Sequence, residues 1–141
     1  MRKNNLWTVL GTALLVILAG LLVACSDTAG GTTKKTEPYT ATADDTGRKT
    51  MTLTPKAVER LGIQVAEITD GTVPYAAVLY GLNGETYVYA NTGENTYLRE
   101  DITVDRIEGN TAILSDGPPD GTLVVTVGGS ELYGIDTGVG K

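Results

Sequence analysis

The stretch NGETYVYANTGENTYLREDITVDRI, residues 83–107, decides the fold of this chain. It opens with Asn83-Gly84, a strong hairpin turn, because type I′ turns need positive φ at both central positions. An alternating run over 85–91 follows, and the turn residues 92–95 lead into a second run over 97–107. Two runs of β-forming residues joined in this way indicate a pair of antiparallel strands.

The same pattern continues on both sides of this hairpin. Further strands are expected over 50–53, 63–68, 75–80, 111–114 and 123–127, each bounded by Gly, Pro, Asn or Asp. Thr54 as N-cap, Pro55 at the first helical position and Gly62 as terminator predict one short helix. A single helical turn over 130–133 and a flexible tail over 135–141 complete the chain. Short strands at this spacing predict a mainly β fold, a small antiparallel β-barrel over residues 50–134.

The aromatic residues are unusual. The chain has no Phe, its one Trp is Trp7, and it has seven Tyr. Tyr87 and Tyr89 fall on the same side of one strand, with Tyr75 expected nearby, so these three are the candidates for a stacking surface that binds a ligand. The interpretation we favour is that these side chains fill a core that lacks Phe.

The N-terminus has the pattern of an export signal. Arg2-Lys3 precede an uncharged apolar run from Leu6 to Ala24, and Leu22-Val23-Ala24-Cys25 resembles the lipobox of bacterial lipoproteins. This resemblance implies a signal peptide over 1–24 and a membrane lipid attached through Cys25, where two acyl chains suffice for stable anchoring. An uncleaved signal anchor is the alternative, since about 20 apolar residues span a bilayer. Both place residues 26 onward at the outer face of the cytoplasmic membrane.

Residues 25–49 are rich in Thr, Gly, Ala and Asp and have no hydrophobic periodicity. This composition predicts a disordered, lipid-anchored linker between Cys25 and the barrel.

Composition also excludes several kinds of chemistry. One Cys and no His exclude disulfide frameworks, the usual zinc sites and Ser–His–Asp triads. A formal net charge of −6 is unsuited to nucleic acid. The carboxylates of Asp101, Asp105 and Glu108, or of Asp116 and Asp120, are the candidates for paired acid–base groups, but they fall on solvent-facing or turn positions. We therefore expect a protein that is not an enzyme and has no cofactor or metal.

A wider resemblance joins these features. The residues that carry it are Met51–Thr54, Leu61–Ile63, Val65-Ala66, Val73-Pro74, Ala77-Val78, Gly84–Val88, Tyr97–Arg99, Ile102–Val104, Gly109–Leu114, Asp116-Gly117, Gly121, Val124–Gly128 and Leu132. In order and spacing they resemble the membrane-proximal β-barrel domain of efflux periplasmic adaptor subunits, also called membrane fusion proteins. The resemblance implies contact with a polytopic transporter of the RND or ABC type.

The chain departs from that family in two places. Only 69–72 separate the strands between which adaptors carry a lipoyl-like domain and a helical hairpin, and Pro118-Pro119 replaces a Leu-containing loop. We therefore expect a reduced, non-catalytic adaptor-like accessory of an exporter. The alternative is a free-standing cell-envelope lipoprotein that binds a ligand or wall polymer, and the oligomeric state stays open.

Overall fold

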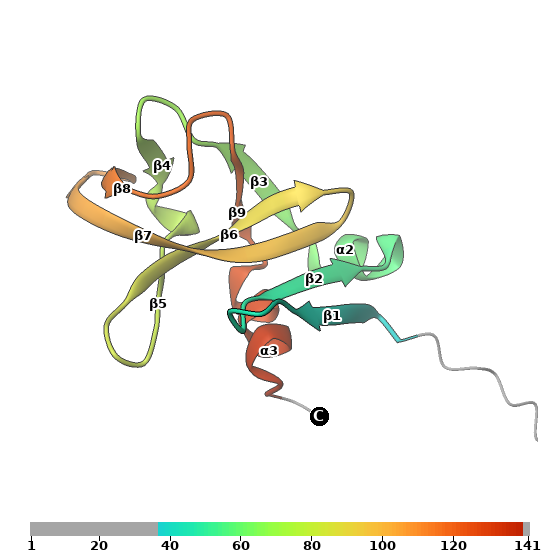
Figure 1. Ribbon diagram of the computed structural model, residues 1–141. Coiled ribbons are helices and arrows are strands. Elements are labelled where there is room, and N and C mark those ends of the chain that lie inside the picture. Colours follow the sequence, from blue (N-terminus) through green and yellow to red (C-terminus); the bar gives the residue numbers. More distant parts are fainter. Residues whose placement is uncertain (1–36, 140–141) are drawn as a thin grey trace, which may run out of the picture. The chain divides into compact units, whose positions relative to one another are not determined.

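The computed structural model describes residues 37–139 (Figure 1). The elements in chain order are β1 (Tyr39–Ala43), β2 (Lys49–Leu53), α2 (Pro55–Leu61), β3 (Gln64–Glu67), β4 (Thr72–Pro74), the 3₁₀ helix η1 (Tyr75–Ala77), β5 (Leu79–Tyr80), β6 (Thr86–Gly93), β7 (Thr96–Glu108), β8 (Thr111–Asp116), β9 (Leu123–Val127) and α3 (Gly129–Thr137). All strand pairings are antiparallel. The predicted mainly β fold is confirmed. The predicted signal peptide, Cys25 and the linker up to residue 36 lie outside the described residues.

The β6–β7 hairpin is the centre of the sheet. The two strands pair from Thr86↔Ile102 to Gly93↔Thr96, and β7 then continues beyond β6 to pair with β8 from Thr103 onward. Register shifts on both sides of Val104 mark the point where β7 changes partner. Such bulges bend a strand, so the long β7 carries the sheet around a corner (Figure 1).

Strands β4, β8, β7, β6, β9 and β3 follow one another around a closed apolar interior. The ring closes between β3 and β4 through a tight turn and not through a ladder. Thr69 and Thr72 exchange backbone hydrogen bonds of 3.2 and 2.9 Å, and the amide of Leu114 donates to the carbonyl of Gly71 at 2.8 Å. This ring is the small antiparallel barrel that the turn pattern predicts.

Strand β6 separates two apolar clusters because side chains alternate across a strand. Val88 faces the barrel interior, which we call cluster 1: Ile68, Val73, Ala77, Val78, Val88, Ile102, Ala112 and Val124. Tyr87 and Tyr89 face outward into cluster 2: Met51, Leu53, Tyr87, Tyr89, Tyr97, Val125 and Leu132. Strand β9 divides in the same way, with Val124 in cluster 1 and Val125 in cluster 2. The outer face of the barrel is therefore a second core.

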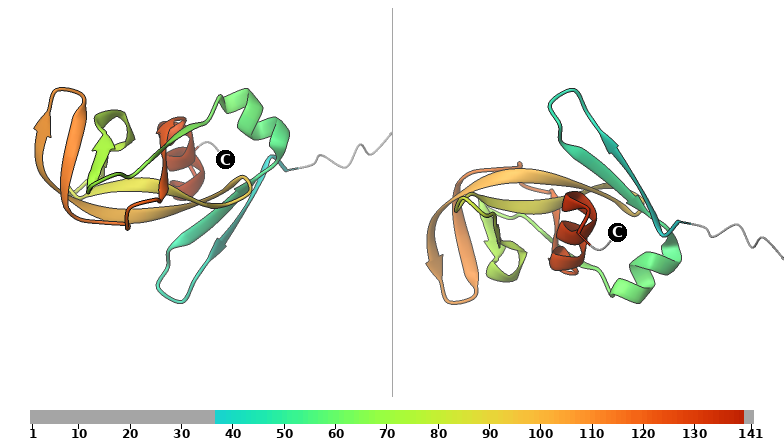
Figure 2. Two further views of the ribbon diagram at one scale, coloured as in Figure 1. Left: turned by 90° about the horizontal axis from the view of Figure 1, so that it is seen from above. Right: turned by 90° about the horizontal axis from the view of Figure 1, so that it is seen from below.

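Strands β1 and β2 and the two helices cover cluster 2 (Figure 2). Thr54 caps α2 by accepting a hydrogen bond from the Ala57 amide at 3.2 Å, and Gly62 ends the helix with φ 61°. Helix α3 begins at Gly129, directly after its N-cap Gly128, whose φ is 94°. A Cβ at Gly128 would lie 2.9 Å from Cγ1 of Ile63, so this close approach also favours glycine.

Three local predictions were wrong. Residues 39–43 form β1, paired with β2 from Tyr39↔Leu53 to Ala43↔Lys49, although this segment was predicted to be disordered linker. Tyr75–Ala77 form η1, so the strand expected over 75–80 shrinks to β5. Helix α3 continues to Thr137, beyond the single turn expected over 130–133 and into the predicted flexible tail.

Candidate functional site

The three candidate tyrosines do not form one stacking surface. Tyr87 and Tyr89 point to the same side of β6, as expected, but they are 1% and 0% exposed. Their rings pack edge to face with centroids 5.7 Å apart inside cluster 2. Tyr75 lies apart from them and is exposed, with its hydroxyl 3.4 Å from that of Tyr80. The favoured interpretation therefore holds for Tyr87 and Tyr89: they fill a core that has no Phe.

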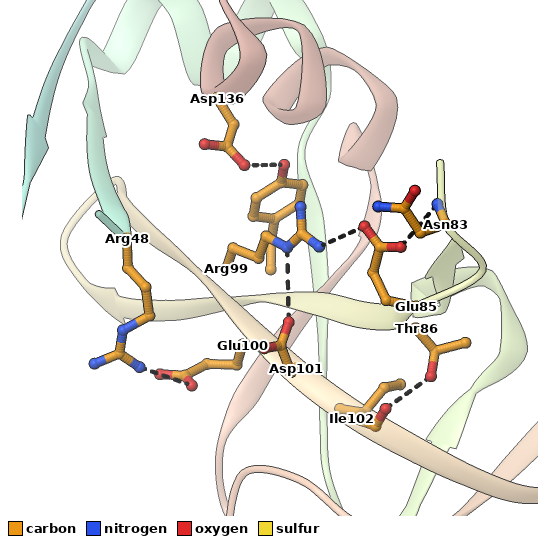
Figure 3. Close-up of polar contacts among 10 residues, drawn as sticks. Arg48, Asn83, Glu85, Thr86, Arg99, Glu100, Asp101, Ile102 and Asp136 are labelled. Atoms are coloured by element: carbon orange, nitrogen blue, oxygen red, sulfur yellow. Dashed lines mark hydrogen bonds and ion pairs between the residues drawn. The ribbon is translucent and has the colours of Figure 1, made fainter. Parts of the chain in front are cut away.

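Charged groups close over this tyrosine pair, and Figure 3 shows Arg99, Glu85 and Asp136 among them. The Arg99 guanidinium lies 3.8 Å from the centroid of the Tyr87 ring and is held by Glu85 at 3.4 Å. The Tyr89 hydroxyl donates to Asp136 on α3 at 3.1 Å, and Lys49 on β2 donates to the backbone carbonyl of Asp136. Burial raises the pKa of Tyr89 above its ordinary value, with the nearby Asp136 carboxylate acting in the same direction. These contacts tie β2, β6, β7 and α3 together and leave the two rings no route to a ligand.

The candidate carboxylates take part in surface and turn structure. Asp105 and Glu108 both bind Arg106, at 2.9 and 2.7 Å, and Asp101 lies 3.8 Å from Arg99. Asp120 accepts a hydrogen bond from the Gly71 amide at 2.9 Å. Within residues 37–139 no group of three or more His, Cys, Asp or Glu side chains is placed to hold a metal ion.

A groove of about 890 Å³ lies between β1, α2 and α3. Its apolar lining comes from Tyr39, Leu53, Ala57, Leu61, Ile135 and Val139. The charged side chains along it are Lys56 and Arg60 on α2 and Glu131 on α3. We call this surface the α2–α3 groove. A largely apolar cleft of this size with a few charged groups is typical of ligand sites.

No family model, curated protein or solved structure matches the chain. Between residues 37 and 139 there is no helix with the length and apolar character needed to cross a bilayer, and the apolar run 6–24 lies outside that range.

A second surface is the free edge of β1. The amide of Thr54 donates to the carbonyl of Pro38 and that of Asp44 to the carbonyl of Arg48, both at 2.9 Å. Because hydrogen-bonded pairs alternate along an antiparallel ladder, Thr40 and Thr42 face β2 with their backbone groups. The amides and carbonyls of Tyr39, Ala41 and Ala43 then point to the outer edge, where no strand of the described chain pairs with β1. This edge is a template for strand addition.

The sequence signals of these two surfaces are weak. The groove needs β1, which has no hydrophobic periodicity, and α3, whose Gly and Asp residues are poor helix formers. Lys56 and Arg60 four residues apart on a short helix were the one local indication of a basic patch.

Proposed function

We propose that this protein is a lipid-anchored, non-catalytic accessory of a membrane exporter, held at the outer face of the cytoplasmic membrane. The observation that carries the anchor is the lipobox-like Leu22-Val23-Ala24-Cys25 at the end of an uncharged apolar run. In lipoproteins the cysteine thiol of this motif receives the diacylglyceryl group, whose two acyl chains give stable membrane attachment.

The domain beyond the anchor suits a role by contact. Fully extended, the chain between Cys25 and Pro38 reaches at most about 45 Å, so an anchored barrel stays close to the bilayer and to proteins embedded in it. The β1 edge offers backbone groups to an extended segment of a partner. The order of the barrel segments, which resembles the membrane-proximal domain of adaptors, supports a polytopic exporter as that partner.

Anchoring is tested by replacing the acylated residue. Cys25→Ser is expected to leave an unprocessed precursor or to release the protein, and the mature wild type should carry the mass of a diacylglyceryl group. Two results together would contradict lipidation: a wild-type protein with the mass of unmodified residues 25–141, and a Cys25→Ser variant that the membrane retains as well as the wild type. Ser26→Ala is the matched control, because it changes the neighbouring residue and leaves the thiol.

Transporter contact is tested separately by crosslinking in intact membranes. A photo-crosslinking residue at Ala41, on the free edge of β1, is expected to capture a polytopic membrane protein. The same residue at Asp116 on β8, away from that edge, is the control and should not capture it. If no partner protein copurifies with the chain in mild detergent and neither position gives a crosslink, the accessory role would be contradicted.

The α2–α3 groove favours a second candidate function. A free-standing lipoprotein that binds a small ligand would need a concave apolar site of this kind, and an adaptor that works only by contact would not. A ligand-dependent rise in melting temperature distinguishes the two, because a ligand that binds only the folded state stabilises it by mass action.

A further inference from the structure

The cations of the barrel domain are distributed unevenly. Arg48, Lys49, Arg99 and Arg106 each lie within 4.0 Å of a carboxylate. The other two cations in residues 37–139, Lys56 and Arg60, have no ion pair within that part of the chain. Both lie on α2 and both line the α2–α3 groove.

The two cations are exposed neighbours on α2, and Arg60 lies in the last turn, where the helix dipole favours a cation. Two like charges four residues apart on a helix destabilise it by a few tenths of a kcal/mol. The domain around them is acidic, so carboxylates to pair with them are plentiful, yet the pair stays beside an apolar cleft. A ligand that brings a negative group next to an apolar body would complement both features.

We propose that the α2–α3 groove binds one membrane phospholipid, with its phosphate at Lys56 and Arg60 and its acyl chains on the apolar lining. The proposal names the ligand class for the second candidate function and rests on it. Arg and Lys are the side chains that bind phosphate, Arg through its planar fork and Lys as a point charge. Tyr39, Leu61 and Val139 along the groove supply the apolar surface that a hydrocarbon chain needs.

The position of the groove favours a bilayer lipid over a soluble amphiphile. Pro38 lines the groove, and the chain that runs back from it reaches Cys25 within at most about 45 Å. Tethering at that distance raises the effective concentration of membrane lipid at the site. Glu131 is the one acid among the lining residues and accepts a hydrogen bond from Ser130 at 2.9 Å. With two cations and one carboxylate, the lining has a net positive charge.

Native mass spectrometry of the mature-length chain, residues 25–141 with Cys25→Ser, tests the proposal. In this protein neither an attached lipid nor the apolar run 6–24 can fill the groove. Three probes with the same oleoyl chains are compared: phosphatidylglycerol, diacylglycerol and free oleic acid. We expect one phosphatidylglycerol per chain, bound at least 10-fold more tightly than diacylglycerol, which lacks the phosphate.

Variants locate the bound lipid. Lys56→Gln with Arg60→Gln should weaken phosphatidylglycerol about 10-fold and leave diacylglycerol unchanged. Val139→Asp, at a position 73% exposed, should weaken both probes without unfolding the protein. Arg106→Gln is the matched control, a surface cation away from the groove, and should change neither. Melting temperatures of all variants show that loss of binding is not loss of fold.

Several results would overturn the proposal. Equal binding of diacylglycerol and phosphatidylglycerol would mean that the phosphate is not recognised, and oleic acid that displaces the phospholipid would assign the groove to a free fatty acid. Unchanged binding in the double variant would place the lipid elsewhere, and no binding of any probe would refute the site. None of these outcomes bears on the Cys25 anchor, which is measured by the mass and fractionation of the wild type.

Discussion

The residues that fix the outer core are a tyrosine pair and the charges around it. Tyr87, Tyr89 and Tyr97 are buried, and burial raises the pKa of each phenol above its ordinary value. A phenolate in cluster 2 would lose its hydration, and at Tyr89 the neighbouring Asp136 carboxylate would also repel it. At Tyr87 the Arg99 guanidinium acts in the opposite direction, but burial has the larger effect and the pKa is still raised. The folded state therefore keeps these three phenols protonated at a pH where the unfolded chain ionises.

This difference predicts alkaline instability. A raised folded pKa means that stability is fully present below the unfolded tyrosine pKa of about 10 and is lost as pH rises above it, by up to ~1.4 kcal/mol per pH unit for each buried phenol. Tyr89→Phe removes one of these titrating groups, so its stability should fall less steeply than that of the wild type above pH ~10. At pH 7 the same change should cost ~1 kcal/mol through the lost bond to Asp136.

Denaturant unfolding between pH 7 and 12 measures both effects. Tyr39→Phe is the control, because its ring is only partly buried at the margin of cluster 2, and it should reproduce the wild-type slope. A Tyr89→Phe curve parallel to the wild type at every pH would contradict the assignment of the alkaline loss to buried phenols.

At the scale of elements, β1 depends on β2 far more than on its own sequence. Its burial pattern shows only Tyr39 partly covered, so it contributes little apolar area. What positions it is the ladder with β2 and the turn that joins them, where Asp44 accepts from the amide and the hydroxyl of Thr46 at 2.9 and 2.6 Å. An exposed two-stranded hairpin of this kind is marginal by itself and needs support from its neighbours, here β7 and α2.

Proline scanning tests which edge of β1 is free. Ala41→Pro removes an amide that faces the outer edge, so it should cost less than ~1 kcal/mol, since edge strands tolerate proline there. Thr42→Pro removes an amide that bonds to β2, so it should cost ~3 kcal/mol or detach the hairpin. Hydrogen exchange of the β2 amides measures how far each variant loosens the β1–β2 ladder. Equal protection of these amides in both variants would mean that the inward- and outward-facing backbone groups of β1 are wrongly assigned.

The difference between β1 and the β6–β7 hairpin explains how far the sequence can predict this fold. Asn83-Gly84 and residues 92–95 specify turns through local backbone preferences, so β6 and β7 could be placed from sequence alone. The strand over 39–43 has no such signal because its structure comes from pairing with residues 49–53. Local propensity likewise misjudges α3, whose Leu132 is fully buried in cluster 2 by contacts distant in sequence.

The candidate site divides in the same way. The shared face of Tyr87 and Tyr89 follows from the strand period and was predicted correctly. Their burial depends on Met51, Val125 and Leu132, which no local pattern connects to β6. The α2–α3 groove depends on the same distant packing, so it becomes visible only when β1, α2 and α3 are in place.

The whole domain is built on a sheet that belongs to two cores at once. β6 supplies Val88 to cluster 1 and Tyr87 with Tyr89 to cluster 2, and β9 supplies Val124 and Val125 in the same manner. If one cluster loses its packing, β6 and β9 lose support on that face. The other cluster needs the same two strands, so it is weakened as well. We therefore expect the barrel and its outer layer to unfold as one cooperative unit.

Two truncations on opposite faces of the sheet test this cooperativity. Val88→Ala empties part of cluster 1 and should cost ~2 kcal/mol, and Met51→Ala empties part of cluster 2 and should cost ~3 kcal/mol. The near-ultraviolet circular dichroism of Tyr87, Tyr89 and Tyr97 reports cluster 2, while the far-ultraviolet signal reports the whole sheet. Because both clusters share β6 and β9, Val88→Ala should shift the tyrosine transition as far as the sheet transition, although it touches no tyrosine-side packing. A Val88→Ala protein whose tyrosine signal melts at the wild-type temperature while its sheet melts earlier would show two independent cores, and the coupling through β6 would then be wrong.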